Sequence, residues 1–475
     1  MNSNFSYQSP LSHRYASKEM SSLFSEETKY ITWRKLWIAL AKAQKSLGIA
    51  ITKEQIDSMV KNLYELDLDL AAEYENRFKH DVMAHIHTYG DICHEAKGII
   101  HLGATSCFVT DNADLILMKQ GLTLIHSKIL QAVRNLSAFA EKHASLACLS
   151  YTHFQPAQPT TVGKRACLWL QDLLMDLHDI EEKIHSLRFL GAKGATGTQA
   201  SFLTLFDGDH NKVKQLDLSV AKEMGFERLI PVSGQTYTRK QDIRIIQVLS
   251  SFAATAHKIA TDIRLLSNSK EISENFEAHQ VGSSAMPFKR NPIRSERICG
   301  LSRYLMSLNE NPLYTASTQW LERTLDDSSN RRLALPDAFL TADAVADLLV
   351  FLFSDLKVDE KNIRKNLVEE LPFMAVETIL MHASKKGKDR QLLHERLRAY
   401  SMESIQQQEP GTHLLNKIVS DALFDLSREE IEEFMKEEHF IGRSNHQVLE
   451  FLHDEVQPVL KKNSHIIAYK PLVNV

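Results

Sequence analysis

The amino-acid sequence predicts an all-α protein built around a central bundle of long helices. Three observations support this prediction. Only 17 glycines and 12 prolines are distributed over 475 residues. The alternation of apolar and polar residues that is typical of half-buried strands is almost absent. Apolar residues instead recur at steps of three and four over long stretches, which is the pattern of a helix that buries one face.

Three apolar stripes predict the long helices. They run from Leu115 to Leu136, from Val162 to Leu187 and from Ile245 to Leu266. The second would be roughly 39 Å long at about 1.5 Å per residue. Helices of this length pack nearly parallel, at about 20°. Further leucines lie beside the second stripe: Leu168, Leu170 and Leu174. One packed face does not cover them, so we expect bundles to associate into an oligomer.

Length and pattern together predict about three domains. Residues 1–105 contain shorter helices and polar linkers. Residues 106–358 contain the long helices, and residues 359–475 contain short, charged helices. No internal repeat or low-complexity tract is evident.

The composition excludes several classes of protein. Hydrophobic residues make up 43% and charged residues 24% of the chain, which is typical of a globular protein. A net charge of −4 argues against a generally basic surface for nucleic acid or membranes, so anion binding would need a local cluster. Five scattered cysteines without C-x-x-C spacing indicate reduced thiols. No signal peptide or membrane span is evident, and we expect a soluble, cytoplasmic protein.

The stretch from Gly282 to Pro292, GSSAMPFKRNP, is the strongest candidate for a functional loop. Its prolines prevent a regular helix, and its glycine permits backbone angles that other residues avoid. Ser283 or Ser284 offers a hydroxyl, Lys289 a cation and Asn291 an amide. Arg294 and Arg297 follow in a helix that we expect Pro292 to start. A polar loop of this kind suits a lid over an anionic substrate, and the alternative is an ordinary exposed loop.

Two further stretches precede the long helices. LSYTHFQPAQPTTVGKR at 149–165 carries His153 among polar residues, and histidine is the usual proton donor at neutral pH. HLGATSCFVTDNAD at 101–114 carries Thr105 and Ser106, and we expect Asp111 or Asn112 to cap the helix that follows. The alternatives are a structural histidine in the first stretch and plain capping in the second.

Three more stretches carry polar clusters. RFKHDVMAHIH at 77–87 invites a metal interpretation, but its histidine spacing does not fit one helix face, and His80 beside Lys79 is more typical of an anion contact. GQTYTRKQD at 234–242 contains Gln235 and Tyr237 and is as typical of a turn and cap as of a site. LERTLDDSSNRR at 321–332 gathers Arg323, Ser328, Arg331 and Arg332, with a solvated helix end as the alternative.

Taken together, these stretches resemble the fumarase/aspartase superfamily, whose signature is G-S-x-x-M-P-x-K-x-N. The signature is matched by Gly282, Ser283, Met286, Pro287, Lys289 and Asn291. Within that superfamily the sequence is similar to the adenylosuccinate lyases of animals. This similarity extends over nearly the whole chain, through SHRYAS at 12–17, KHDVMAH at 79–85, GATSC at 103–107, THFQPAQPTT at 152–161, SGQTYTRK at 233–240, LERTLDDSSNRR at 321–332 and KKGKDRQLLHERLR at 385–398.

The resemblance implies a three-domain fold in a homotetramer with a 20-helix core, in which three subunits form each active site. It implies β-elimination of fumarate from adenylosuccinate, giving AMP, and from the succinyl-carboxamide ribotide SAICAR, giving AICAR. It implies no metal and no organic cofactor.

Residue roles also follow from the resemblance. Ser283 would be the general base and His153 the general acid. Lys289 and Asn291 would stabilise the dianionic aci-carboxylate intermediate, and Glu296 would orient the site. The substrate would be lined by Arg14, Tyr15, Lys79, His80, Asp81, Thr105, Ser106, Gln235, Arg297, Arg323, Ser328 and Arg332. Related enzymes often have arginine at the position of Lys79, which keeps the charge but not the bidentate fork.

Two alternatives remain at this point. One is another lyase of the superfamily, such as argininosuccinate lyase or fumarase, although a substrate without phosphate would need fewer cations. The other is a non-catalytic homologue with a structural role, although His153 and Ser283 both stand in intact motifs.

Overall fold

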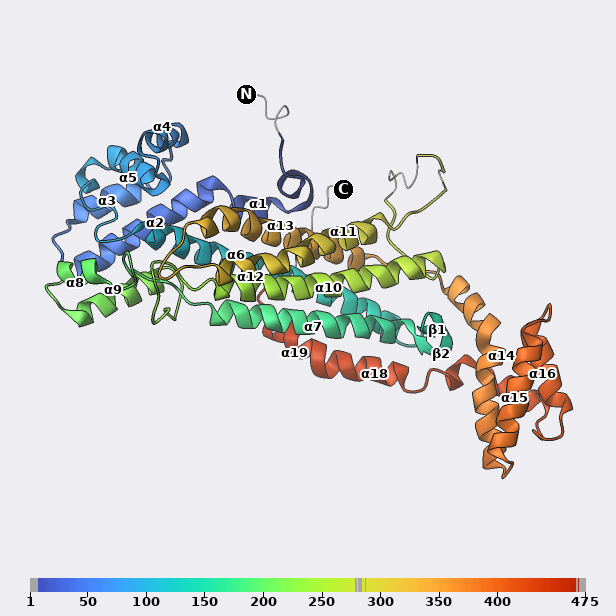
Figure 1. Ribbon diagram of the computed structural model, residues 1–475. Helices are drawn as coiled ribbons and strands as arrows, with labels where there is room; N and C mark the ends of the chain where they lie inside the picture. Colours follow the sequence, from blue (N-terminus) through green and yellow to red (C-terminus); the bar gives the residue numbers. More distant parts are fainter. Residues whose placement is uncertain (1–6, 278–279, 281–283, 287, 467–468, 470–475) are drawn as a thin grey trace.

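The computed structural model describes residues 7–277, 280, 284–286, 288–466 and 469. Long helices dominate it and lie side by side in an elongated body, as predicted for an all-α fold (Figure 1). None of the helices in the described part has an apolar stretch that would reach across a membrane.

α3, α4 and α5 lie at one end of the body, and α2 runs from there along the bundle toward α1 and η2, which lie beside α13 (Figure 1). Ser25 caps α2, and Thr52 and Gln55 form a reciprocal capping box at α3. The bounds are η2 Leu11–Tyr15, α1 Lys18–Leu23, α2 Glu26–Ser46, α3 Lys53–Lys61, α4 Leu68–Phe78, α5 Asp81–Ile92 and η3 His94–Ala96.

The central elements confirm the three predicted long helices. The apolar stripes lie in α6, α7 and α10, and nearly all of their residues are buried, as in the run Leu115, Leu122 and Ile129 of α6. The bounds are α6 Ser106–Lys142, β1 Ala147–Thr152, β2 Gln155–Thr161, α7 Val162–Ser186, α8 Ala200–Leu205, α9 His210–Glu223, α10 Lys240–Asn268, β3 Ile272–Ser273, α11 Ile293–Ser307, η4 Leu308–Glu310, α12 Asn311–Ser317, α13 Asp326–Ser354 and β4 Lys357–Val358.

Two short antiparallel pairs accompany the helices. β1 pairs with β2 in a hairpin, and β3 pairs with β4 beside the end of α10. The polar stretch around His153 therefore forms a hairpin, with Thr152 opposite Gln155 and a bulge between Cys148 and Ser150. The alternating pattern of strands was weak there because prolines occupy two positions of β2.

The last helices pack in two places. α14 to α17 surround an apolar cluster of their own, which includes Ile379, Leu397 and Leu414. α18 instead lies along α7, and its Val448 joins the main apolar core (Figure 1). The bounds are α14 Glu360–Lys385, α15 Arg390–Ser404, α16 Pro410–Ser420, α17 Arg428–Phe434, η5 Glu437–His439, α18 Ser444–Phe451, η6 Leu452–Val456 and α19 Gln457–Lys462. The domain boundaries at 105 and 358 stay a prediction.

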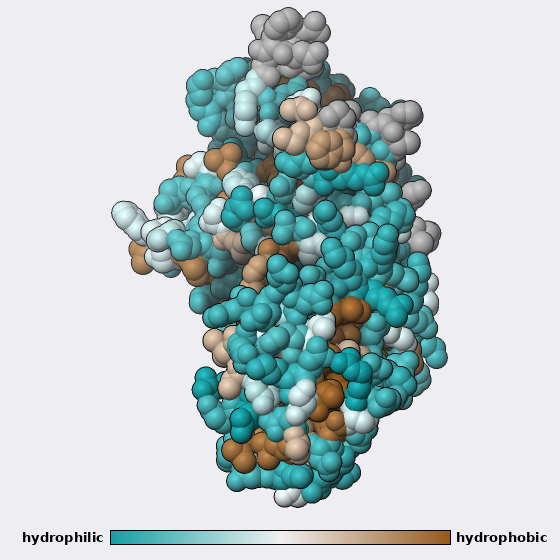
Figure 2. All heavy atoms as spheres, turned by 90° about the vertical axis from the view of Figure 1, so that its right-hand side faces the viewer, coloured by the Kyte–Doolittle hydropathy of each residue, from teal (hydrophilic) through white to brown (hydrophobic). Residues whose placement is uncertain are grey.

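Several apolar side chains remain exposed on this single chain. On the bundle, Leu168 and Met175 of α7 and Leu265 of α10 are exposed by 52%, 63% and 43%. Viewed from the end that carries α14 to α16, the surface is largely hydrophilic, with apolar residues gathered in a few places (Figure 2). Leu170, in contrast, is fully buried within the chain. The long-helix bundle thus leaves an apolar strip uncovered, though a narrower one than the sequence predicts.

Candidate active site

The predicted site residues of α5, α6 and α13 come together at the N-terminal ends of these helices. His80 caps α5, and its Nδ1 accepts the N–H of Met83 at 3.3 Å. Because Nδ1 is an acceptor, the neutral ring carries its proton on Nε2, which lies 3.4 Å from Oγ of Ser106. Asp81 accepts a hydrogen bond from Arg332 at 2.7 Å. Three helices that are distant in sequence therefore share one polar cluster.

Gln235 links this cluster to two loops. Its side-chain amide donates to Oγ1 of Thr105 at 3.4 Å, and its backbone N–H donates to the carbonyl of Glu322 at 3.1 Å. A side chain at Gly234 would lie only 2.6 Å from the same carbonyl, so only glycine permits this close approach. The loops around residues 235 and 322 are thereby held against the start of α6.

A cavity of about 260 Å³ lies beside this cluster, between α2, α6 and α13. Its lining includes the predicted residues Arg323, Ser328 and Arg332, and also Lys29 of α2. Burial and the positive charge of Arg332 lower the pKa of Lys29. Among the described residues, no carboxylate lies within 4 Å of the Lys29 ammonium, which packs over the rings of Tyr30 and Trp33. The cavity therefore offers positive charge that the chain itself neutralises only in part.

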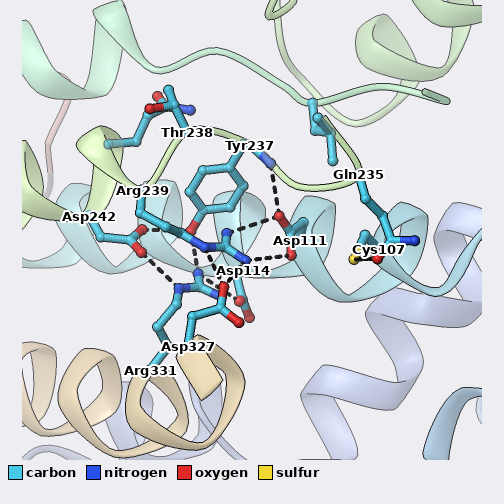
Figure 3. Close-up of polar contacts among 12 residues, drawn as sticks. Cys107, Asp111, Asp114, Gln235, Tyr237, Thr238, Arg239, Asp242, Asp327 and Arg331 are labelled. Carbon is cyan, nitrogen blue, oxygen red and sulfur yellow. Dashed lines mark hydrogen bonds and ion pairs between the residues drawn. The ribbon is translucent and has the colours of Figure 1, made fainter. Parts of the chain in front are cut away.

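Beneath the cavity, Arg239 is enclosed by two carboxylates (Figure 3). Its Nε donates to Asp327 at 2.7 Å, and its NH1 donates to Asp111 at 2.9 Å. The exposed fraction of Arg239 is 3%, and those of both aspartates are 2%. Asp111 also accepts the backbone N–H of Tyr237 at 3.0 Å. Arg239 is thus a structural cation whose charge is balanced inside the protein.

Arg331, which lies next to Arg239, is also held by carboxylates (Figure 3). It donates to Asp242 at 2.7 Å and pairs with Asp114 at 2.9 Å. The hydroxyl of Tyr237 donates to Asp242 at 2.6 Å and accepts from Arg331. The adjacent Arg332 has an exposed side chain and reaches the opposite way, to Asp81. Both arginines line the cavity, but Arg331 is buried and paired with carboxylates, whereas Arg332 is exposed.

A second group of predicted residues lies elsewhere, where η2 meets α11. The guanidinium of Arg297 lies 6.0 Å from the centre of the Tyr15 ring, and that of Arg14 lies 5.9 Å from it. Burial, together with the positive charge of Arg14, lowers the pKa of Arg297. Arg14 is exposed and Arg297 is half-buried, so the two cations flank the Tyr15 ring at the surface.

The signature stretch leads into this second group. α11 begins at Ile293, directly after Pro292, as the sequence predicts. Glu296 is exposed on its first turn, and Asn291 is half-buried just before it. Lys289 is exposed, and its N–H donates to the carbonyl of Met286 at 2.9 Å. The predicted base Ser283 lies outside the described residues, together with Gly282 and Pro287.

His153 occupies a third place, at the tip of the β1–β2 hairpin. It forms the two-residue turn with Phe154, and their φ values are 52° and 57°. This turn conformation normally requires glycine or asparagine, so two bulky residues there are under backbone strain. Both side chains are exposed. Strain that presents a histidine at a tip favours a functional role over a structural one.

The three places are separate within one chain. The hairpin lies at the end of the bundle opposite to α5, while η2 lies along α13 (Figure 1). Lys79, at the left-handed end of α4, belongs with the first group because it adjoins His80. A single chain therefore brings together most of the predicted substrate residues but not the predicted acid with them.

One expectation about the sequence near α6 is wrong. Asp111 and Asn112 do not cap this helix, because it begins at Ser106 with Thr105 as its N-cap. Both residues lie buried inside the helix, where Asp111 binds Arg239 and Asn112 accepts the N–H groups of Leu190 and Gly191. Sequence reasoning also missed Lys29, which stands on an ordinary amphipathic helix and gave no separate signal.

The histidines of α5 do not converge. His80 caps the helix, whereas His85 stacks on Tyr30 with ring centres 3.6 Å apart. His87 packs against Phe78, with ring centres 4.8 Å apart. In the part of the chain that the structure describes, no group of three or more His, Cys, Asp or Glu side chains is placed to hold a metal ion.

Comparison with solved structures identifies the fold. A 3-carboxy-cis,cis-muconate lactonizing enzyme from Pseudomonas putida matches with a TM-score of 0.83 at 21% identity, over 93% of this chain and 98% of that one. A fumarate lyase from Mesorhizobium sp. BNC1 matches with a TM-score of 0.80 at 20% identity, over 93% and 99%. A family model described as lyase matches residues 15–306. Fold and family model together define a lyase of the fumarase/aspartase superfamily.

The more similar relatives narrow the class. A model described as adenylosuccinate lyase C-terminus matches residues 372–451. The adenylosuccinate lyase of Saccharomyces cerevisiae is 49% identical over 96% of both chains, and that of Schistosoma mansoni is 48% identical over 99% of both. The chain belongs to the adenylosuccinate lyase family. The alternative of an argininosuccinate lyase is therefore not favoured.

Proposed function

We propose that this protein catalyses β-elimination of fumarate from adenylosuccinate, giving AMP, and from SAICAR, giving AICAR. The observation that carries the proposal is the cationic cavity at α13. Arg323, Ser328 and Arg332 line it beside the cluster of His80 and Ser106, in a chain whose relatives at 48–49% identity are adenylosuccinate lyases. Both substrates carry a phosphate and two carboxylates, which require such cations.

The elimination needs a base and an acid. Ser283 removes the β-proton of the succinyl group, and the electron pair of the C–H bond forms the aci-carboxylate. The C–N bond then breaks, and His153 protonates the departing nitrogen. The exposed position of His153 on a strained turn supports its role as a donor that reaches into a site from outside its own chain.

The base needs electrostatic help, because a serine hydroxyl is a very weak acid. Lys289, backbone N–H groups and the exclusion of water supply it. Lys289 and Asn291 also stabilise the negative charge that develops on the carboxylate, an effect worth several kcal/mol in preorganised sites. Glu296 orients the residues at the start of α11. Their common position around Pro292 supports this division of roles.

Substrate binding is divided between two groups of residues. Arg14, Tyr15 and Arg297 form one cationic surface. The residues at and beside the cavity, here called the cavity group, form the other. The cavity group consists of Lys79, His80, Asp81, Thr105, Ser106, Gln235, Arg323, Ser328 and Arg332.

We infer that the protein is a homotetramer in which three subunits complete each active site. Two observations support this. The three groups of predicted residues lie apart on one chain, and exposed apolar residues such as Leu168, Met175 and Leu265 lie on the long helices (Figure 1). Association of the bundles would cover those residues and bring the groups together. A cytoplasmic location agrees with the five unpaired cysteines.

The direct test is release of fumarate from adenylosuccinate by the purified protein, followed by ultraviolet absorbance. Argininosuccinate serves as the control substrate. Turnover of argininosuccinate alone would overturn the proposal.

A further inference from the structure

The segment that carries Arg14 and Tyr15 packs against the main core through Leu11, Tyr15 and Ala16. It forms the short helix η2, in which only Leu11 is buried. Ala16 closes this helix, since its N–H donates to the carbonyl of Leu11 at 2.8 Å. The next residue, Ser17, begins α1. A contact at Ser17 therefore fixes the C-terminal end of this segment, directly after Arg14 and Tyr15.

Ser17 is held by a buried carboxylate. Its backbone N–H donates to Oδ2 of Asp343 at 2.7 Å. The other oxygen of Asp343 accepts from the ammonium of Lys128 at 2.5 Å, and that ammonium also binds Asp347 at 3.0 Å. The exposed fractions are 0% for Asp343, 1% for Lys128 and 5% for Asp347. The carboxylate of Asp343 thus joins α6, α13 and the N-terminal segment.

The two carboxylate oxygens of Asp343 bind different partners. Charge-assisted hydrogen bonds are about twice as strong as neutral ones, and burial strengthens them further. One oxygen is committed to Lys128, so the carboxylate cannot turn away from its partner. The other oxygen is thereby aimed at Ser17. The proposed mechanism gives none of these buried groups a part, although such charges are costly to bury.

We propose that Asp343 is a positioning residue, which places Arg14 and Tyr15 for substrate binding through the N–H of Ser17. The inference rests on the proposed function, because it takes Arg14 and Tyr15 as substrate residues. It predicts that loss of this one hydrogen bond weakens substrate binding more than it slows the chemical step.

Asp343→Asn removes the acceptor of the hydrogen bond from Ser17. Asparagine has one acceptor oxygen, which will bind the Lys128 ammonium. The amide NH₂, which is a donor, will then face the N–H donor of Ser17. Asp347→Asn is the matched control. It also removes one carboxylate from Lys128, but Asp347 has no bond to the N-terminal segment among the described contacts. Both changes should lower the melting temperature, and only Asp343→Asn should displace Ser17.

Ser17→Pro removes the donor of the same hydrogen bond without changing the buried charges. The φ of Ser17 is −64°, which proline adopts, and Ala16 has a ψ of 155°, which suits a residue before proline. Proline removes the N–H, and it also removes the hydroxyl that accepts the N–H of Met20. Ser17→Ala removes the hydroxyl alone and is the matched control.

The readout is KM and kcat for adenylosuccinate, with the melting temperature as a measure of folding. We expect KM to rise about tenfold in Asp343→Asn and Ser17→Pro relative to their controls. We expect kcat at saturating substrate to change by less than about threefold, because the hydrogen bond does not touch the reacting atoms. The inference requires that KM differ between Asp343→Asn and Asp347→Asn, and also between Ser17→Pro and Ser17→Ala. A rise in KM shared by both members of either pair, or absent from both, would overturn the inference.

Arg14→Ala provides the reference that separates this inference from the proposed function. If Arg14→Ala raises KM while Asp343→Asn and Ser17→Pro behave like their controls, the role of Asp343 is wrong and the role of Arg14 stands. If Arg14→Ala leaves KM unchanged, the substrate role of Arg14 and the inference both fail.

Discussion

The guanidinium of Arg332 donates to the carboxylate of Asp81 at 2.7 Å, and the two residues are 251 positions apart in sequence. This contact joins the second turn of α13 to the first turn of α5 beside the cationic cavity, which Arg332 lines. Asp81 holds the guanidinium in place before any ligand arrives. The side chain of Arg332 nevertheless remains 58% exposed, so it can donate to an anion as well.

The neighbouring arginines of α13 should respond differently to the same substitution. Arg331→Met should lower the free energy of unfolding by about 3–5 kcal/mol, because it leaves the buried Asp242 and the half-buried Asp114 without their cation. Arg332→Met should change stability little but raise KM by about 10- to 100-fold, through loss of a charged contact to substrate. Denaturant unfolding and steady-state kinetics would check the two. Equal effects of both variants on KM would contradict the assignment.

Replacement of the proposed base should separate binding from turnover. Ser283→Ala should reduce kcat by at least about a thousandfold and leave the affinity for adenylosuccinate nearly unchanged, since the proton is removed only in the chemical step. The measurement is fumarate release together with equilibrium binding of the substrate. Ser284→Ala, one residue on, is the control and should retain activity. Substantial activity in Ser283→Ala would place the base elsewhere.

The proposed sharing of active sites between subunits predicts complementation between inactive variants. His153→Gln and Ser283→Ala homotetramers should each be inactive. Mixed tetramers should regain part of the wild-type rate, because some of their sites draw both intact residues from different subunits. Subunit exchange would be followed with two tags of different mass. No recovery despite proven exchange would argue against the shared site.

The buried His85 should make folding sensitive to acid. Burial and the charges of Arg34 and Lys29 lower its pKa to about 4, against 6.5 for an unfolded chain. The unfolded state then binds a proton first, so stability is present above pH 6.5 and is lost as the pH falls toward 4. This loss amounts to about 3 kcal/mol. His85→Phe keeps the stack on Tyr30 and should remove that part of the pH dependence. Identical unfolding profiles across this pH range would show that His85 does not contribute.

The helices could be predicted from sequence because their apolar stripes are long and regular. The stripe through Leu115, Leu122 and Ile129 places α6 without knowledge of its neighbours. The hairpin of His153 could not be predicted in the same way. Its strands are short, and two prolines interrupt the alternation that marks a strand.

The roles of the site residues could also be predicted only in part from the sequence. The motif grouped Arg331 with Arg332, but it could not tell that Arg331 is buried against carboxylates while Arg332 is exposed, since both arginines look alike in sequence. Asp111 and Asn112 resembled helix caps because the start of α6 was placed too late. Lys29 and Asp343 gave no signal, since their partners lie on other helices. Long-range pairing, not local pattern, decides these roles.

The most direct test of the account is the reaction itself. Purified protein should convert adenylosuccinate to AMP and fumarate in equal amounts, measured by ultraviolet absorbance and by separation of the products. We expect turnover that depends on Ser283 and His153 and no release of fumarate from argininosuccinate. Intact protein that binds adenylosuccinate without releasing fumarate would contradict the proposed function.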